Sequence, residues 1–66
     1  MKKISVSLSG HQTSISLEEE FVDALNKIAN NDKVSVASII NKIDSTRKPG
    51  TNLSSAIRIW ILKNHL

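Results

Sequence analysis

The side chains that could carry catalytic or metal chemistry are few and scattered in this sequence. There is no cysteine, and His11 and His65 are the only soft metal ligands. A structural zinc site needs four such ligands, so we expect no metal. The run Glu18-Glu19-Glu20 suits the first turn of a helix, where carboxylates favour the positive end of the helix dipole. The chain has no phosphate-binding loop or nucleophile elbow, so we expect neither an enzyme nor a cofactor.

The charge balance favours a polyanionic partner. Nine Lys and Arg against six Asp and Glu give a net charge of +3, which raises the expectation of nucleic-acid binding. Residues 1–17 contain no acidic side chain. No apolar run is long enough to span a membrane, and the first residues lack the apolar stretch of a signal peptide. We therefore expect a cytoplasmic protein without a membrane contact.

Two segments, residues 4–8 and 13–17, alternate apolar and hydroxyl side chains. A period of two with β-branched residues indicates strands with one wet face, and we predict a strand over residues 12–17. Its two faces are Gln12, Ser14 and Ser16 on one side and Thr13, Ile15 and Leu17 on the other. Either the two segments form a local hairpin, or the second pairs with its counterpart in another chain. Both arrangements need helices or another chain behind them.

Three helices are predicted after the strands, over residues 18–31, 35–45 and 52–64 of a single domain covering 1–66. Ser35 is the expected N-cap of the second helix. The third is apolar nearly all the way round and needs covering on several sides. A core this small is marginal alone, so we expect dimerisation. The expected dimer core is Ile15, Leu17, Phe21, Leu25, Ile39, Ile40, Ile43 and Trp60.

Two motifs resemble those of a small bacterial subfamily of ribbon-helix-helix (Arc/MetJ-type) DNA-binding proteins. Residues 10–18 read Gly-His-Gln-Thr-Ser-Ile-Ser-Leu-Glu, similar to Gly-His-Arg-Thr-Ser-x-x-Leu-Glu in that subfamily. Residues 52–58 read Asn-Leu-Ser-Ser-Ala-Ile-Arg, similar to its Asn-Leu-Ser-Ser-Ala-x-Arg segment. The resemblance implies a mainly α fold with a short β-ribbon, built as an intertwined homodimer, with an extra C-terminal helix.

The resemblance also implies sequence-specific binding of double-stranded DNA by a homodimeric bacterial repressor. One strand from each chain would form a two-stranded ribbon that enters the major groove. The implied base-contacting residues are Gln12, Ser14, Ser16 and His11. The implied phosphate-contacting residues are Ser35 and Val36 at a helix N-terminus, with Lys33, Lys2 and Lys3. Gln12 replaces the subfamily's arginine and can contact adenine, while DNA shape or the nearby Lys2, Lys3 and His11 can also supply specificity.

Several alternatives stay open at this stage. Residues 1–9 form either an additional strand or a basic arm laid along DNA. Arg58 contacts a phosphate or pairs with an acidic residue. The polar strand face could also be merely solvated. The alternative function is an antitoxin or small adaptor whose C-terminal helix binds a partner protein. Because the sequence ends soon after that helix, a stand-alone regulator is favoured.

Overall fold

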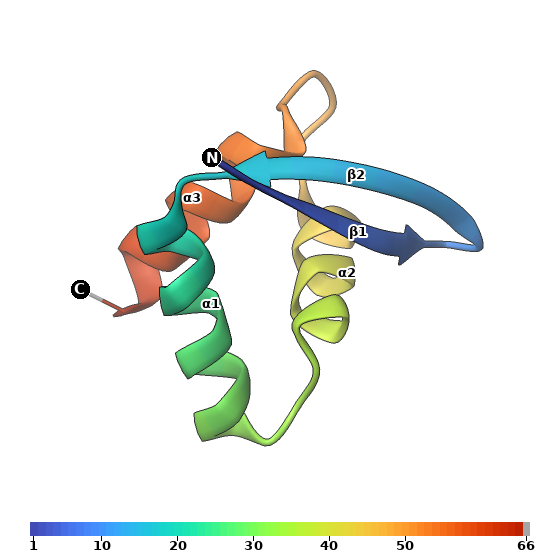
Figure 1. Cartoon of the computed structure of the whole chain (residues 1–66). Helices are drawn as coiled ribbons and strands as arrows, with labels where there is room; N and C mark the ends of the chain where they lie inside the picture. Colours follow the sequence, from blue (N-terminus) through green and yellow to red (C-terminus); the bar gives the residue numbers. More distant parts are fainter. Residues whose placement is uncertain (66) are drawn as a thin grey trace.

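The computed structural model describes residues 1–65 and consists of a β-hairpin followed by three helices. The elements are β1 (Lys2–Leu8), β2 (His11–Leu17), α1 (Glu19–Asp32), α2 (Val36–Thr46) and α3 (Leu53–His65). The hairpin lies across one end of the helical layer (Figure 1). The sequence-based expectation of a mainly α fold with a short β-ribbon and an extra C-terminal helix is confirmed. None of the helices within residues 1–65 is long and apolar enough to cross a membrane.

A two-residue turn joins β1 and β2 into an antiparallel ribbon within one chain. Ser9 and Gly10 have φ of 50° and 84°, and positive φ at both central residues is the requirement of a type I′ hairpin turn. The register runs from the Leu8–His11 pair beside the turn to the Lys2–Leu17 pair at the open end. The first segment is therefore a strand. Residues 4–8 and 13–17 thus form a local hairpin, while pairing of residues 12–17 with their counterpart in another chain stays a prediction.

The inner face of the ribbon belongs to the core. Val6 and Ile15 are buried there, and Leu17 is completely inaccessible to solvent. Six residues of the expected dimer core are buried within the single chain: Ile15, Leu17, Leu25, Ile39, Ile40 and Ile43. Phe21 and Trp60 are only partly buried at the core's margin. The core also contains Val6, Ile57 and Ile61, which the sequence analysis left out. One chain thus covers these residues without a partner.

Each helix begins directly after the residue that the sequence analysis placed at its start. Ser35 Oγ accepts a hydrogen bond from the Ser38 amide at 3.0 Å, and Asn52 Oδ1 accepts one from the Ser55 amide at 3.2 Å. Both are N-cap contacts that satisfy free amides of the first helical turn. Glu18 precedes α1 without a side-chain cap. The helix bounds in the structure accordingly lie one residue later than the predicted ones.

Lys33 ends α1 in a left-handed conformation, with φ of 55°. The amide of Lys33 donates to the Asn30 carbonyl at 3.2 Å, and that of Val34 donates to the Ala29 carbonyl at 3.0 Å. This pair of hydrogen bonds is a Schellman motif, whose left-handed position glycine normally occupies. A lysine there accepts backbone strain at the point where the chain turns toward α2.

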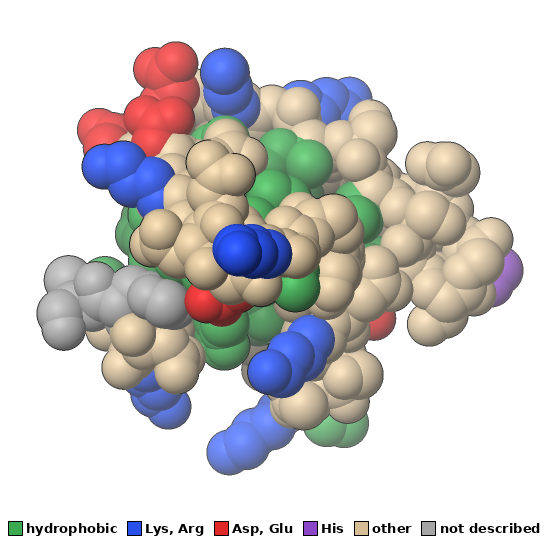
Figure 2. Space-filling model, turned by 90° about the horizontal axis from the view of Figure 1, so that it is seen from below, with side chains coloured by type: hydrophobic (Ala, Val, Ile, Leu, Met, Phe, Trp, Pro, Cys, Tyr) green, Lys and Arg blue, Asp and Glu red, His purple; other side chains and the backbone are tan. Residues whose placement is uncertain are grey.

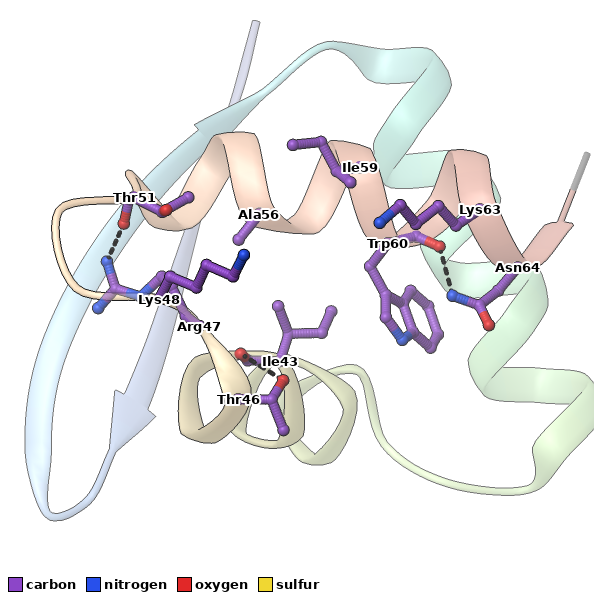
Figure 3. A pocket seen from close by; sticks show the side chains of 10 residues that line it. All are labelled: Ile43, Thr46, Arg47, Lys48, Thr51, Ala56, Ile59, Trp60, Lys63 and Asn64. Carbon is purple, nitrogen blue, oxygen red and sulfur yellow. Dashed lines mark hydrogen bonds between the residues drawn. The ribbon is translucent and has the colours of Figure 1, made fainter.

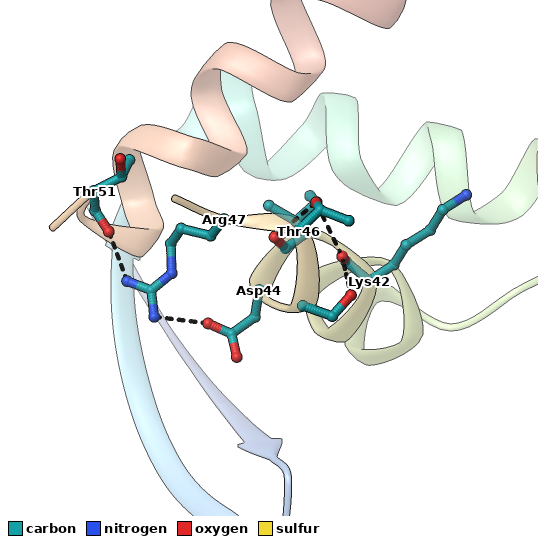
Figure 4. Close-up of polar contacts among 7 residues, drawn as sticks. Lys42, Asp44, Thr46, Arg47 and Thr51 are labelled. Atoms are coloured by element: carbon teal, nitrogen blue, oxygen red, sulfur yellow. Dashed lines mark hydrogen bonds and ion pairs between the residues drawn. The ribbon is translucent and has the colours of Figure 1, made fainter. Parts of the chain in front are cut away.

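Arg47 fixes the connection between α2 and α3. Its Nη2 lies 2.8 Å from Asp44 Oδ1, and its Nη1 donates to the Thr51 carbonyl at 2.7 Å (Figure 4). Within this connection, the Thr51 amide donates to the Lys48 carbonyl at 3.1 Å. That turn has proline at position 49 and Gly50 with φ of 87°, the features of a type II turn. The connection therefore holds the start of α3 in a defined place.

The hairpin register predicts a specific disulfide. Ser5 and Ser14 are directly opposite, in a pair that does not exchange backbone hydrogen bonds, where Cα atoms are about 4.5 Å apart. We expect the Ser5→Cys/Ser14→Cys variant to oxidise to an intramolecular disulfide, measured as loss of both thiols without a covalent dimer on a non-reducing gel. The out-of-register control is Ser5→Cys/Gln12→Cys. Covalent dimers from the in-register pair would contradict the hairpin.

Candidate nucleic-acid interface

The exposed side of the ribbon carries only polar side chains. Its residues, called the outer face below, are Lys3, Ser5 and Ser7 from β1 and Gln12, Ser14 and Ser16 from β2, and all are exposed. The register pairs Lys3 with Ser16, Ser5 with Ser14, and Ser7 with Gln12. The face thus has one cation, one carboxamide and four hydroxyls, with no acidic or large apolar group. Short donors and acceptors on a flat ribbon can approach a polar surface closely.

The structure separates the residues that the resemblance grouped as base contacts. Gln12, Ser14 and Ser16 share the outer face, whereas His11 lies opposite Leu8 on the other side of the ribbon, beside the turn. Lys2 likewise points to the inner side, opposite Leu17, so it diverges from Lys3. The side chain of His65 lies outside the described part of the chain.

Two outer-face residues, Ser5 and Ser7, were missed by the sequence analysis. The alternation of hydroxyl and apolar side chains in residues 4–8 was the available signal. This signal could not place the two serines on the outer face, because the sequence did not show which strand pairs with residues 4–8. Once β1 is paired with β2, the same alternation doubles the polar surface.

Both edges of the ribbon have neighbours. Asn41 Nδ2 in α2 donates to the Ser7 carbonyl at 3.0 Å and to the Ala37 carbonyl at 2.8 Å, which fastens the edge of β1 to that helix. Along β2, a groove of about 320 Å³ is bordered by residues 13–16, Arg47 and the first residues of α3. The helices therefore bound the ribbon on both sides and leave its outer face uncovered.

The N-terminus of α2 is the second candidate contact. Ser35 Oγ is occupied by the Ser38 amide, while the amides of Val36 and Ala37 stand in the first turn, where no intrahelical acceptor exists. Such amides, with the helix dipole, favour an anion. Lys33 adds a cation two residues before Ser35. In Figure 1 this end of α2 lies below the ribbon, beside the connection from α1.

The cations do not gather into one patch on the helical side of the molecule. Seen from below, Lys and Arg side chains are spread around the surface, while most of the acidic side chains in view gather at one corner (Figure 2). Two of the cations are engaged in ion pairs with Asp44 and Glu18, namely Arg47 and Arg58. Net charge alone therefore does not locate a binding surface, and the composition of the outer face is the more specific signal.

Arg58 forms an ion pair with Glu18 across 40 residues of sequence. Its Nε donates to Glu18 Oε1 at 2.8 Å, and its Nη2 donates to Oε2 at 3.4 Å. The hydrogen bond from Arg58, with its positive charge, lowers the pKa of the Glu18 carboxyl below its usual value of 4.5. The pair joins α3 to the junction of β2 and α1. Of the two alternatives for Arg58, the structure shows the ion pair.

α3 presents apolar side chains beside a groove at its junction with α2. The groove measures about 350 Å³, and its lining includes Ile43, Lys48, Ile59, Trp60 and Lys63. The Trp60 indole points into the space between the two helices (Figure 3). On α3, Ile59 is 48% exposed and Leu62 is 46% exposed. The sequence analysis expected this helix to need covering on several sides. In one chain, part of its apolar surface stays uncovered.

The order of a two-stranded antiparallel ribbon followed by helices is consistent with the ribbon-helix-helix class. A family model described as a Ribbon-helix-helix domain matches residues 1–65. The chain belongs to this family. Comparisons with curated proteins and with solved structures gave no significant match. The family places the chain among DNA-binding regulators and antitoxins, a regulatory rather than an enzymatic class.

The Glu18–Arg58 pair predicts a defined pH dependence of stability. Because the folded-state pKa of Glu18 is lowered, its contribution to the free energy of unfolding is complete above pH 4.5 and is lost as the pH falls through the lowered value. Glu18→Gln should therefore be less stable than the unmodified chain near pH 7, with the difference vanishing in acid. Urea titrations across this range measure it. Glu19→Gln removes a charge from the same turn as a control; a difference for Glu18→Gln independent of pH would contradict the assignment.

Proposed function

We propose that the chain is a sequence-specific double-stranded DNA-binding protein, acting as a cytoplasmic bacterial transcriptional repressor. The observation that carries this is the outer face, six exposed polar side chains in register on a two-stranded ribbon. The major groove of B-DNA is about 12 Å wide and admits such a ribbon. Four serines keep the face shallow, so the backbone can come close to the base edges.

In this proposal Gln12 reads adenine through its N6 and N7 atoms, and Ser14 and Ser16 contact neighbouring base edges. His11 lies on the other side of β2, so we reassign it from the bases to the DNA backbone beside the turn. Phosphates are held by the free amides of Ser35, Val36 and Ala37 at the start of α2 and by Lys33, with Lys2 near the open end of the ribbon. These phosphate contacts set the position of the protein and carry no sequence information.

The family implies dimerisation, and α3 offers the surface for it. Ile59 and Leu62 are large apolar side chains about half exposed, three positions apart and hence on one side of the helix. We propose that they meet their counterparts in a homodimer. Two chains would then bring two ribbons to one DNA duplex.

The DNA-binding proposal predicts a strong dependence on salt and on the charge of the outer face. If a dimer neutralises about six phosphates, the logarithm of affinity should fall with the logarithm of salt concentration with a slope of about −5. Ser14→Glu places a carboxylate at the centre of the outer face and should abolish duplex binding, measured by fluorescence anisotropy. Asn26→Glu makes the same charge change at an exposed site on α1 and should bind nearly as well. A slope near zero would sink the proposal.

A second candidate is an antitoxin or small adaptor that binds a partner protein through α3. The exposure of Ile59 and Leu62 favours it as well, because either a second copy or another protein could cover them. Sedimentation of the purified chain and of Ile59→Lys/Leu62→Lys separates the two. A dimer that becomes a folded monomer in the variant supports the homodimer. A chain that is monomeric alone, and binds a different protein that the variant releases, supports the adaptor.

A further inference from the structure

The groove between α2 and α3 has an apolar floor and a cationic rim. The side chains of Ile43 and Trp60 point into the space between the two helices, and Ala56 adds to the apolar lining (Figure 3). Lys48 approaches from the connection after α2 and Lys63 runs along α3, so that their ammonium groups point toward one another (Figure 3). Among the described residues that line the groove, none is acidic.

The positive charge at the rim comes from the two lysines rather than from Arg47. Arg47 already pairs with Asp44 at 2.8 Å and donates to the Thr51 carbonyl at 2.7 Å. Lys48 and Lys63 are exposed, and neither forms an ion pair with a side chain that the structure describes. A carboxylate placed between the two ammonium groups would gain charge-assisted hydrogen bonds without displacing an existing partner.

The other polar side chains of the lining are engaged with the backbone. Thr46 Oγ1 donates to the Ile43 carbonyl at 3.2 Å, and Asn64 Nδ2 donates to the Trp60 carbonyl at 2.8 Å. These contacts leave the lysines as the groups that decide the charge of a ligand. The groove therefore complements an anion rather than a cation.

The size and the walls of the groove suit a small molecule with a flat body. The volume of about 350 Å³ is at the lower end of the range for small-molecule sites, about 300–1,000 Å³, and such sites often lie between helices. Ile43 is only 4% exposed, so the floor of the groove is anchored in the core. The Trp60 indole provides an aromatic wall, against which another ring packs in an offset or edge-to-face arrangement.

We propose that the α2–α3 groove binds a small aromatic carboxylate, with its ring against Trp60 and Ile43 and its carboxylate between Lys48 and Lys63. Charge complementarity selects the anion, and the apolar walls select the ring. This site is separate from the outer face of the ribbon and does not depend on the DNA-binding proposal. Ile59 belongs both to this lining and to the surface proposed for the homodimer, so a second copy is the competing occupant.

Titration of the purified full chain with 2-naphthoate tests the site, with calorimetry for affinity and NMR for location. Trp60 is the single tryptophan, so its indole N–H resonance should shift as the groove fills. Lys48→Gln and Lys63→Gln should each weaken binding by about 1.5- to 5-fold, the range of exposed ion pairs. Lys42→Gln is the matched control, because this exposed lysine of α2 lies outside the lining, and it should leave the affinity unchanged.

The uncharged analogue naphthalene-2-carboxamide keeps the ring and removes the charge, and it should bind more weakly by roughly 2- to 25-fold, the product of the two lysine effects. Equal binding of the amide and the carboxylate, or no shift of the Trp60 resonance, would overturn the proposal. Binding that disappears as the chain is concentrated into a dimer would assign the groove to a second copy. A shift with a glutamate-rich peptide containing phenylalanine, but not with 2-naphthoate, would assign it to a protein partner; either result also overturns the proposal.

Discussion

The alternation of side chains across the β1–β2 hairpin is the constraint on which the molecule depends. Val6 and Ile15 point into the core, so the residues on either side of each must point outward. A slip of one residue would send serines into the core and isoleucines into water. The Ser9-Gly10 turn closes the hairpin in one register. Burial of one face therefore determines the composition of the other.

The helices stabilise the ribbon chiefly by covering its inner face, while polar contacts decide where each helix sits. Hydrophobic burial of residues such as Leu17 and Ile57 supplies the free energy. The contact from Asn41 and the Glu18–Arg58 pair lie partly in water and are individually weak. Their value is geometric. They fix α2 along one edge of the ribbon and α3 at the end where β2 passes into α1.

Much of this arrangement could be predicted from local pattern. The period-two segments identify the strands, and the expected cap at Ser35 places the start of α2 to within one residue. The origin of the second strand could not be predicted, because the same alternation suits a hairpin and an intermolecular pair. The turn gave little help: serine at position 9 departs from the Asn-Gly and Asp-Gly pairs that mark such hairpins.

The packing face of α3 and the partner of Arg58 were also beyond local pattern. Ile57 and Ile61 are buried while Ile59 and Leu62 are half exposed, yet all four have the same chemistry. Only the position of the helix in the fold distinguishes them. Glu18 lies 40 residues from Arg58, so no helical spacing relates the two. Long-range pairs of this kind depend on the whole topology.

The covalent link between the two strands also has a kinetic consequence. Two strands joined by a two-residue turn form in about 1–10 μs, without an encounter between chains. An intermolecular ribbon exists only at concentrations where chains are dimeric. Here the β1–β2 pairing is complete within one chain, so this step of folding proceeds at the same rate however scarce the chains are.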